Sequence, residues 1–236
     1  MIADIDGVVL VDGEVLPQTR ELIRHYGASL AFVSNNSTHT RESLCGVFRA
    51  AGVDVEAGQF FLAGTRLIYS AARDFPGGKA LMLATESLRE LAREMGLSSV
   101  SASSWRDVDL VLLCRDTEVS YARLEGAANA VRSGAPLYCA NHDLVHPGKS
   151  AVYLETGCFL ALLGAVHPGL QPRVFGKPDP ALAFDALRYL KLKPEECVFI
   201  GDNLETDAPC ARAAGIPFLH VGGAEGLPLW AFVGSA

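Results

Sequence analysis

The sequence lacks the features that mark several classes of protein. No apolar run approaches the roughly 20 residues that span a bilayer, and no basic segment with an apolar core precedes the first predicted strand. Acidic residues outnumber basic ones by 27 to 20 and neither sign forms a block, so nucleic acid and anionic membranes are not expected as partners. The six cysteines form no Cys-x-x-Cys pair, which argues against a disulfide framework or a zinc site. We expect a cytoplasmic protein.

Apolar residues, by contrast, are plentiful. Half of the 236 residues are hydrophobic and a fifth are charged, which predicts a sizeable buried core and excludes a disordered chain. The length suits one large domain, or a core with a smaller insert. Short β-branched runs alternate with helical patterns along the chain, and this alternation is typical of an α/β fold.

The first buried strand is predicted to end on two carboxylates, Asp4 and Asp6, just before Gly7. If strand geometry holds through Asp6, both side chains lie on one face, where their repulsion calls for a cation. A hard divalent ion such as Mg²⁺ takes oxygen ligands of this kind. The alternative is a strand that ends in a polar turn, which is the commoner meaning of an isolated Asp-x-Asp.

A second predicted strand, residues 29–33, leads into Ser34, Asn35 and Asn36. Their hydroxyl, amide and backbone N–H donors suit an oxyanion, although the same residues suit a loop that caps the next helix. Between the two strands, an Asp-Gly turn at residues 12–13 predicts a β-hairpin. Pro17 then begins a helix that Gly27 ends.

Residues 63–171 predict a second α/β module. The expected strands are 79–84, 109–114 and 136–140, and the expected helices are 86–95, 121–131 and 156–163. A polar loop at residues 141–147 contains His142 and His146, four residues apart. Pro147 and the loop context spoil the helical spacing that a metal-binding histidine pair needs, so we do not expect a metal there.

After residue 171 the sequence contains further strand and helical patterns, with polar residues beside them. Lys177 comes just before a predicted helix that begins near Asp179, and a lone lysine there is usually a solvated surface residue. A further buried strand, residues 197–201, ends on Asp202 and Asn203. Asp207 follows at the start of the next predicted helix.

Taken in order, these segments resemble the four motifs of the haloacid dehalogenase-like (HAD) hydrolases. The matching segments are Asp4-Ile5-Asp6-Gly7-Val8, Ser34-Asn35-Asn36, Gly176-Lys177-Pro178 and residues 201–207. The insert that contains Asn141-His142-Asp143 is similar to the cap of the NagD-like or p-nitrophenylphosphatase branch. The resemblance implies a Rossmann-like parallel-sheet core, residues 1–62 and 172–236, with an inserted α/β cap, residues 63–171.

The resemblance also implies an activity, namely Mg²⁺-dependent hydrolysis of small phosphomonoesters through an aspartyl-phosphate. Asp4 would be the nucleophile and a metal ligand. Asp6 would protonate the leaving oxygen, then activate water, and would bind the metal through its backbone carbonyl. Asp202 would complete the metal ligands supplied by the protein.

The remaining motif residues receive supporting roles by the same resemblance. Phosphate contacts would come from Ser34, Asn35, Asn36 and Lys177, and cap selectivity from Asn141 and Asp143. Asn203 would support the site, and Asp207 would order metal-bound water or Lys177. The expected partner is a small phosphorylated metabolite, with a homodimer through the cap as a further expectation.

Several alternatives share part of the pattern. A receiver-type signalling domain is far shorter and lacks Asp-x-Asp at its first strand, and a dehalogenase proper needs neither Asp6 nor a metal. A phosphomutase shares the acid pair but usually has a different, helical cap. A non-catalytic sugar-phosphate binding protein of the same fold also stays open, because fold alone does not fix function.

Overall fold

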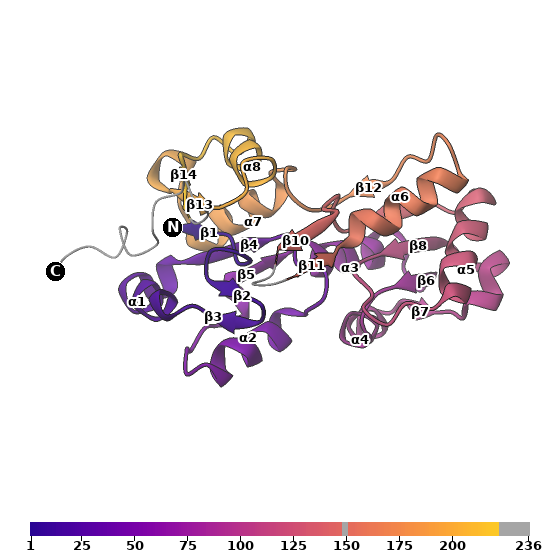
Figure 1. Cartoon of the computed structure of the whole chain (residues 1–236), viewed down its shortest axis with the longest axis horizontal. Coiled ribbons are helices and arrows are strands. Elements are labelled where there is room, and N and C mark those ends of the chain that lie inside the picture. The colour runs from indigo at the N-terminus through magenta and orange to yellow at the C-terminus, as the bar shows by residue number, and fades with distance from the viewer. Residues whose placement is uncertain (148–150, 222–236) are drawn as a thin grey trace. The chain divides into compact units, whose positions relative to one another are not determined.

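The structure is a computed structural model that describes residues 1–147 and 151–221. The described chain forms two compact α/β units (Figure 1). The first unit comprises Met1–Ser34, Arg41–Leu62 and the chain from Gly176 onward, and the second comprises Asn35–Thr40 and Ala63–Phe175. The α/β fold class with an inserted α/β module is thus confirmed. Residues 222–236, which belong to the predicted core, lie outside the described residues.

Five parallel strands form the sheet of the first unit, in the spatial order β14, β13, β1, β4, β5. They are β1 (Ile2–Ala3), β4 (Ala31–Ser34), β5 (Phe60–Leu62), β13 (Phe199–Gly201) and β14 (Phe218–His220). Strand β1 pairs in parallel with β13 on one side and with β4 on the other. The carboxyl ends of three neighbouring strands therefore meet at one edge, where open α/β sheets bind their ligands.

Helices and an aromatic cluster complete the first unit. The helices are α1 (Pro17–Tyr26), α2 (Arg41–Ala50), α7 (Ala181–Leu190) and α8 (Asp207–Ala213). The ring of Phe32 on β4 lies 5.7 Å from that of Phe48 on α2 and 5.1 Å from that of Phe60 on β5. All three rings are buried. This apolar contact fixes α2 on the sheet, because burial of large aromatic side chains dominates core energetics.

Local sequence signals predict the start of the chain closely. The expected hairpin consists of β2 (Leu10–Val11) and β3 (Glu14–Val15). Its turn has positive φ at Asp12 and Gly13, 52° and 75°, as a two-residue hairpin turn requires. Helix α1 begins at Pro17 and ends before Gly27 (φ 49°), as predicted.

The second unit has its own five-stranded parallel sheet, in the order β12, β9, β8, β6, β7. The strands are β6 (Lys79–Leu83), β7 (Ser98–Ser99), β8 (Leu110–Leu113), β9 (Leu137–Cys139) and β12 (Arg173–Val174). Strand β12 pairs with β9, although its two residues fall within the core segment expected from the sequence. The three strands predicted for this module are present, each shorter than expected.

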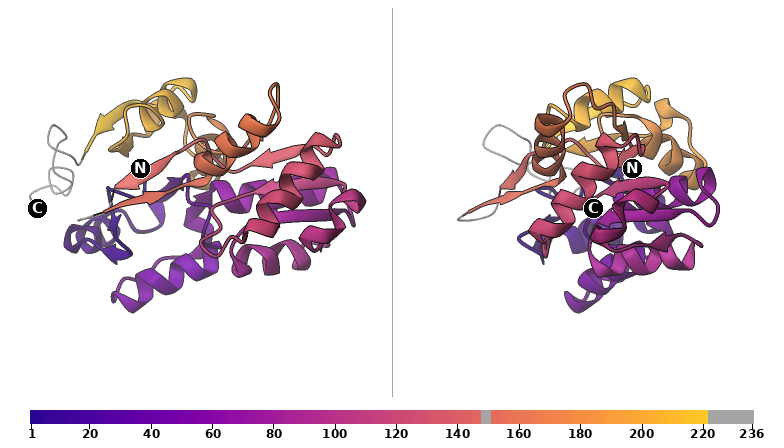
Figure 2. Two further views of the ribbon diagram at one scale, coloured as in Figure 1. Left: turned by 45° about the vertical axis from the view of Figure 1, so that its right-hand side comes forward. Right: turned by 90° about the vertical axis from the view of Figure 1, so that its right-hand side faces the viewer.

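Two helix pairs flank the second sheet (Figure 2). The helices are α3 (Ala63–Asp74), α4 (Glu86–Glu94), α5 (Tyr121–Arg132) and α6 (Thr156–Val166). Helices α5 and α6 contact each other and β8, whereas α3 contacts α4 and β9. Among the described residues, no helix is long and apolar enough to span a membrane.

The predicted polar loop at residues 141–147 is partly wrong. It enters an antiparallel hairpin, β10 (Val145–Pro147) with β11 (Val152–Leu154). Val145, Val152 and Leu154 are exposed on it. Strand β10 forms by pairing with β11, five residues further along the chain, which the polar composition of residues 141–147 did not reveal.

Candidate active site

The polar residues of the first unit follow its three central strands. Asp4 comes directly after β1, Ser34 ends β4, and Asp202 comes directly after β13. The backbone N–H of Asp4 donates to the carbonyl of Ile200 at 2.9 Å, so the pairing of β1 with β13 continues to the carboxylate. Parallel pairing thereby gathers residues that are far apart in sequence.

Lys177 is buried between two carboxylates. Its Nζ lies 2.6 Å from Asp4 Oδ1 and 2.5 Å from Asp207 Oδ1, and the side chain is 2% exposed. Burial acts to lower the pKa of Lys177, but attraction by Asp207 and Asp4 outweighs it and raises the pKa above its usual value. The lysine therefore keeps its proton and serves as a fixed cation, not as a solvated surface residue.

An excess of negative charge surrounds this lysine. Asp4, Asp202 and Asp207 have carboxylate oxygens within 4.8 Å of one another. Burial, and then repulsion from Asp207, raises the pKa of Asp4 well above its usual value, although Lys177 opposes the shift. The same two causes raise the pKa of Asp202 to about 6. Three carboxylates against one ammonium leave room for a divalent cation, which would remove this repulsion.

Asp207 is suited to support this cluster. Its Oδ1 pairs with Lys177, while its Oδ2 accepts a hydrogen bond from the backbone N–H of Asn203 at 3.1 Å. The Asn203 side chain in turn accepts from the N–H groups of Glu205 and Thr206. Because both oxygens of Asp207 are engaged, Asp4 and Asp202 are the members of this group that could more readily hold a cation.

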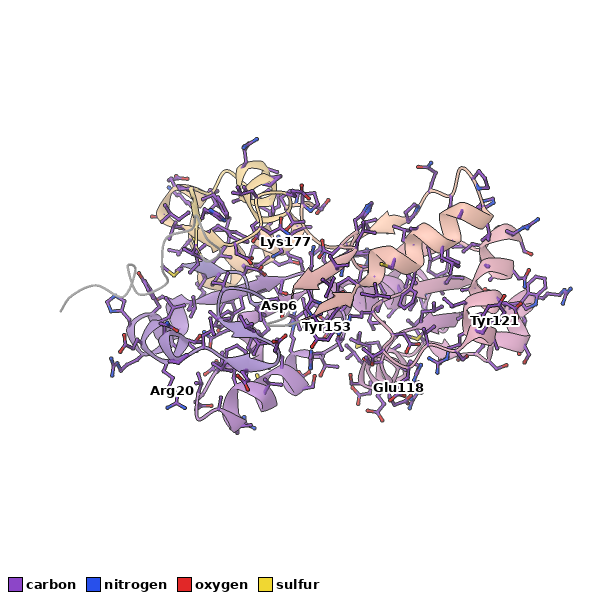
Figure 3. The ribbon with its side chains drawn as sticks, in the orientation of Figure 1. Asp6, Arg20, Glu118, Tyr121, Tyr153 and Lys177 are labelled. Carbon is purple, nitrogen blue, oxygen red and sulfur yellow. The ribbon has the colours of Figure 1, made fainter. Side chains whose placement is uncertain are left out.

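Strand geometry does not hold through Asp6. Strand β1 ends at Ala3, and a turn follows in which the carbonyl of Ile5 accepts from the N–H groups of Val8, Val9 and Leu10. Asp4 is buried whereas Asp6 is exposed. Asp6 Oδ2 accepts a hydrogen bond from Ser34 Oγ at 3.5 Å. Asp6 and Lys177, both labelled in Figure 3, belong to the first unit. The carboxylate of Asp6 is outside the acidic cluster formed by the described residues.

Two glycines make room for the acidic side chains. A Cβ on Gly7 would overlap the carboxylate of Asp202, and a Cβ on Gly201 would overlap that of Asp207. Gly7 also has a φ of +84°, which favours glycine. The sequence motifs contain both glycines, but their steric role depends on contacts that no local pattern shows.

The structure places the other predicted site residues in the second unit. The side-chain amide of Asn35 donates to Asp143 Oδ2 at 2.9 Å, and that of Asn141 donates to the carbonyl of Asn35 at 2.7 Å. Asn36 Oδ1 accepts from the N–H groups of Thr38 and His39, which closes a local turn. These four residues thus form contacts with each other and with their own loop.

His146, on β10, has two side-chain contacts in the second unit. His146 Nδ1 lies 2.7 Å from Glu155 Oε1, and its ring stacks on Tyr153 with centroids 5.1 Å apart. Within residues 1–147 and 151–221, no group of potential metal ligands includes His142 or His146.

One residue near the acidic cluster was not predicted. His220, at the end of β14, places Nε2 3.0 Å from the backbone carbonyl of Asp202. A protonated Nε2 can donate there and hold the turn that presents the Asp202 carboxylate. The available signal was a polar residue at the end of a predicted strand, but the strand order was needed to connect it with Asp202.

Comparison with family models agrees with the segments singled out above. Residues 1–98 match a model described as haloacid dehalogenase-like hydrolase, and residues 174–226 match one described as HAD-hydrolase-like. Together the two matches include more than half of the chain. They contain the strand ends that supply Asp4, Ser34 and Asp202, and also Lys177.

Named relatives resemble nearly the whole chain. A dihydroxyacetone phosphatase from Corynebacterium glutamicum is 25% identical over 218 residues, which cover 91% of this chain and 78% of the relative. NagD from E. coli K-12 superposes with a TM-score of 0.79 at 26% identity, covering 100% of this chain and 91% of that chain.

A third relative was crystallised with metal ions. The glycerol phosphate phosphatase from Mycobacterium tuberculosis, in complex with magnesium, has a TM-score of 0.83 at 27% identity, with 94% of this chain covered. Its calcium complex has a TM-score of 0.83 at 26% identity, with 96% covered. The present chain spans 66% of the mycobacterial chain in the calcium complex and 68% in the magnesium complex.

Proposed function

The chain belongs to the NagD-like branch of the haloacid dehalogenase-like hydrolases and is a phosphatase, and from this premise we propose that Asp4 is its nucleophile. The substrate we propose is a small polyol or sugar phosphate. The observation that supports this function best is the buried ion pair of Lys177 with Asp4 and Asp207 at the carboxyl ends of the central strands. A solvent-excluded, fixed cation beside a carboxylate is the arrangement that phosphoryl transfer requires.

Asp4 would attack phosphorus. Lys177 holds Oδ1, which orients the carboxylate so that its other oxygen can form the bond to phosphorus. As that bond forms, the bond to the leaving oxygen breaks, and Asp6 gives its proton to the leaving alkoxide. Asp6 then takes a proton from water, whose oxygen attacks phosphorus, regenerates Asp4 and releases inorganic phosphate.

Ser34 and Lys177 would bind the transferring group. Ser34 ends β4 with a buried side chain, and its hydroxyl can turn from Asp6 to a phosphoryl oxygen. The ammonium of Lys177 offsets negative charge that develops on that group. Loss of one such donor in a dry site costs about 3 kcal/mol in transition-state stabilisation.

We propose Mg²⁺ as the metal, held by the carboxylates of Asp4 and Asp202 and by the backbone carbonyl of Asp6. The excess of three carboxylates over one ammonium supports a divalent cation at this place. The mycobacterial relative was crystallised with magnesium and with calcium. When bound, the cation supplies charge neutralisation for the phosphoryl group.

Names of two relatives suggest which esters to test first. Glycerol is a three-carbon polyol and dihydroxyacetone is the three-carbon ketose, so their phosphates lead the panel. The experiment measures release of inorganic phosphate from these two esters, several hexose phosphates and p-nitrophenyl phosphate, with and without Mg²⁺. Metal-dependent release supports the proposal, and the preferred ester gives the substrate class.

The same panel separates the two alternatives. A phosphomutase would convert one sugar phosphate into another with little free phosphate, which chromatography of the reaction mixture would reveal. A binding protein would show saturable binding of a sugar phosphate by calorimetry without turnover. Either result, obtained with folded protein and Mg²⁺ present, would contradict the proposed phosphatase mechanism.

We retain three further expectations as proposals. Residues 63–171 would act as a cap on a core of residues 1–62 and 172–236, and the cap would form a homodimer that sedimentation velocity can test. All six cysteines are free thiols, five of them buried, which suits a cytoplasmic location. By the family resemblance, Asn141 and Asp143 would belong to the cap and contribute to its selectivity.

Gly7→Ala is expected to lower kcat/KM by about 100-fold, because the added methyl overlaps the carboxylate of Asp202 and displaces a proposed metal ligand. Steady-state kinetics with p-nitrophenyl phosphate measure the loss. Gly13→Ala is the matched control: its φ of +75° imposes similar backbone strain, but its Cβ would meet nothing within 4 Å. Equal losses of activity in both variants would show that strain alone accounts for the effect.

A further inference from the structure

The segment after Ser34 belongs to the second unit, although Ser34 itself ends β4 of the first. Residues Asn35–Thr40 group with Ala63–Phe175. The chain thus passes from one unit to the other at the peptide bond between Ser34 and Asn35. This bond lies within the Ser34-Asn35-Asn36 motif that the proposed function assigns to the phosphoryl group.

Hydrogen bonds with the loop after β9 hold both the side chain and the backbone carbonyl of Asn35. The side-chain amide of Asn35 donates to Asp143 Oδ2 at 2.9 Å, and its carbonyl accepts from Asn141 Nδ2 at 2.7 Å. Asn141 is fully buried, and its Oδ1 accepts from the N–H of Asp143 at 3.1 Å. Asn141 thereby organises the same loop that supplies the Asp143 carboxylate.

Other parts of the second unit fasten the next residues of the segment. Ser37 Oγ lies 2.9 Å from Thr156 Oγ1 and accepts from the N–H of Arg115 at 3.0 Å. The carbonyl of Asn36 accepts from the N–H of Gly64 at 3.1 Å. Buried hydrogen bonds to several elements make this segment a rigid part of its unit.

Fixing the Asn35 carbonyl also fixes the following N–H. The peptide bond is planar and trans, so the N–H of Asn36 points opposite to the carbonyl of Asn35. Asn141 therefore sets the direction of one backbone donor in the proposed phosphate-binding motif. Asp143 sets the orientation of the Asn35 side chain, whose amide donates to it.

We propose that Asp143 and Asn141 are positioning residues that act on the phosphoryl-binding loop through Asn35, and that they do not select the leaving group. The inference rests on the proposed phosphatase function. It changes the role that the family resemblance gives these two residues, which is selectivity. Their polar atoms bond to Asn35 and to their own loop, as expected of groups that hold a backbone in place.

The two roles predict different kinetics. A residue that contacts the leaving group changes the order of preference among esters. A residue that positions the phosphoryl-binding loop affects all esters equally, because they share the phosphoryl group. It also weakens inhibition by inorganic phosphate, which has no leaving group.

Asp143→Ala is expected to lower kcat/KM by about tenfold for every ester, as loss of a hydrogen bond to a charged acceptor predicts. The ratio of kcat/KM between glycerol phosphate and p-nitrophenyl phosphate should stay within about twofold of the wild-type ratio. The inhibition constant of inorganic phosphate should rise. Asp143→Asn keeps an acceptor oxygen for Asn35 and should restore most of the activity.

A matched control and a double-mutant cycle complete the test. Tyr138→Phe removes a hydrogen bond of similar length, 2.9 Å to Asp74, elsewhere in the second unit and should leave kcat/KM unchanged. If Asp143 acts through Asn35, then Asp143→Ala adds little to the loss already caused by Asn35→Ala.

Three results would overturn the inference. They are additive losses in the double variant, a changed ranking of esters in Asp143→Ala with unchanged inhibition by phosphate, and a Tyr138→Phe loss as large as that of Asp143→Ala. Each of these results can be obtained only if the wild-type protein is an active phosphatase. If the wild type releases phosphate from no ester, the proposed function itself has failed, so the two failures are distinguishable.

Discussion

Asp4→Asn is expected to lower kcat by at least about four orders of magnitude, because it removes the nucleophile while keeping its size. The fold should persist. Burial, and then repulsion from Asp207, raises the pKa of Asp4, so the folded metal-free protein disfavours the charge that the substitution removes. We therefore expect the melting temperature without metal to stay constant or rise.

Three measurements check this prediction. Phosphate release and circular-dichroism melting follow activity and fold, and mass spectrometry of acid-quenched enzyme detects a phosphorylated residue 4 in the wild type only. Asp12→Asn is the control for loss of an aspartate charge, since Asp12 lies in the exposed turn of the β2–β3 hairpin and asparagine tolerates its φ of 52°. Turnover by Asp4→Asn that is free of wild-type contamination would exclude Asp4 as nucleophile.

Removal of the metal is expected to reduce turnover to background, and added Mg²⁺ should restore it. Stability gives a second readout. Burial, and then repulsion from Asp207, raises the pKa of Asp202 from 3.8 to about 6 in the folded chain. The folded metal-free protein therefore holds this proton more tightly than the unfolded chain, and its stability falls as pH rises from 3.8 to about 6.

Bound Mg²⁺ should reverse that loss, since it stabilises the ionised carboxylates by mass action. The rise in melting temperature on adding Mg²⁺ is thus expected to be large at pH 7.5 and small below a pH of about 6. Asp202→Asn should abolish the rise, whereas Asp12→Asn should keep it. Full activity after exhaustive chelation, or an unchanged response to Mg²⁺ in Asp202→Asn, would contradict the metal role.

Much of the fold could be predicted because its signals are local. Apolar runs that end on polar residues gave the positions of β1, β4 and β13, and the carboxyl-end rule for parallel sheets brought Asp4, Ser34 and Asp202 together. Turn and cap residues gave the β2–β3 hairpin and helix α1 almost to the residue. The family resemblance implies that Lys177 offsets charge in the reaction, but its burial is known only from the structure, because a lone lysine in sequence indicates a solvated surface residue.

The rest depends on contacts between distant segments. Nothing near Gly7 shows that Asp202 needs its space, and nothing near His220 shows that it meets the Asp202 carbonyl. Asp6 is exposed because β1 ends at Ala3 and the chain turns after Ile5, whereas strand periodicity suggests a strand through Asp6.

Strand β1 lies between two strands that are synthesised after it, β4 and β13. Of its two neighbours, β4 follows within about 30 residues, whereas β13 is made nearly 200 residues after β1. The second unit's sheet draws on one continuous stretch, Lys79 to Val174, so it can form while the ribosome still holds the rest. Until β13 emerges, β1 has an open edge, and Asp4 lacks both Lys177 and Asp207. A nascent chain therefore has no assembled acidic cluster, and the open edge of β1 needs protection until β13 has been made.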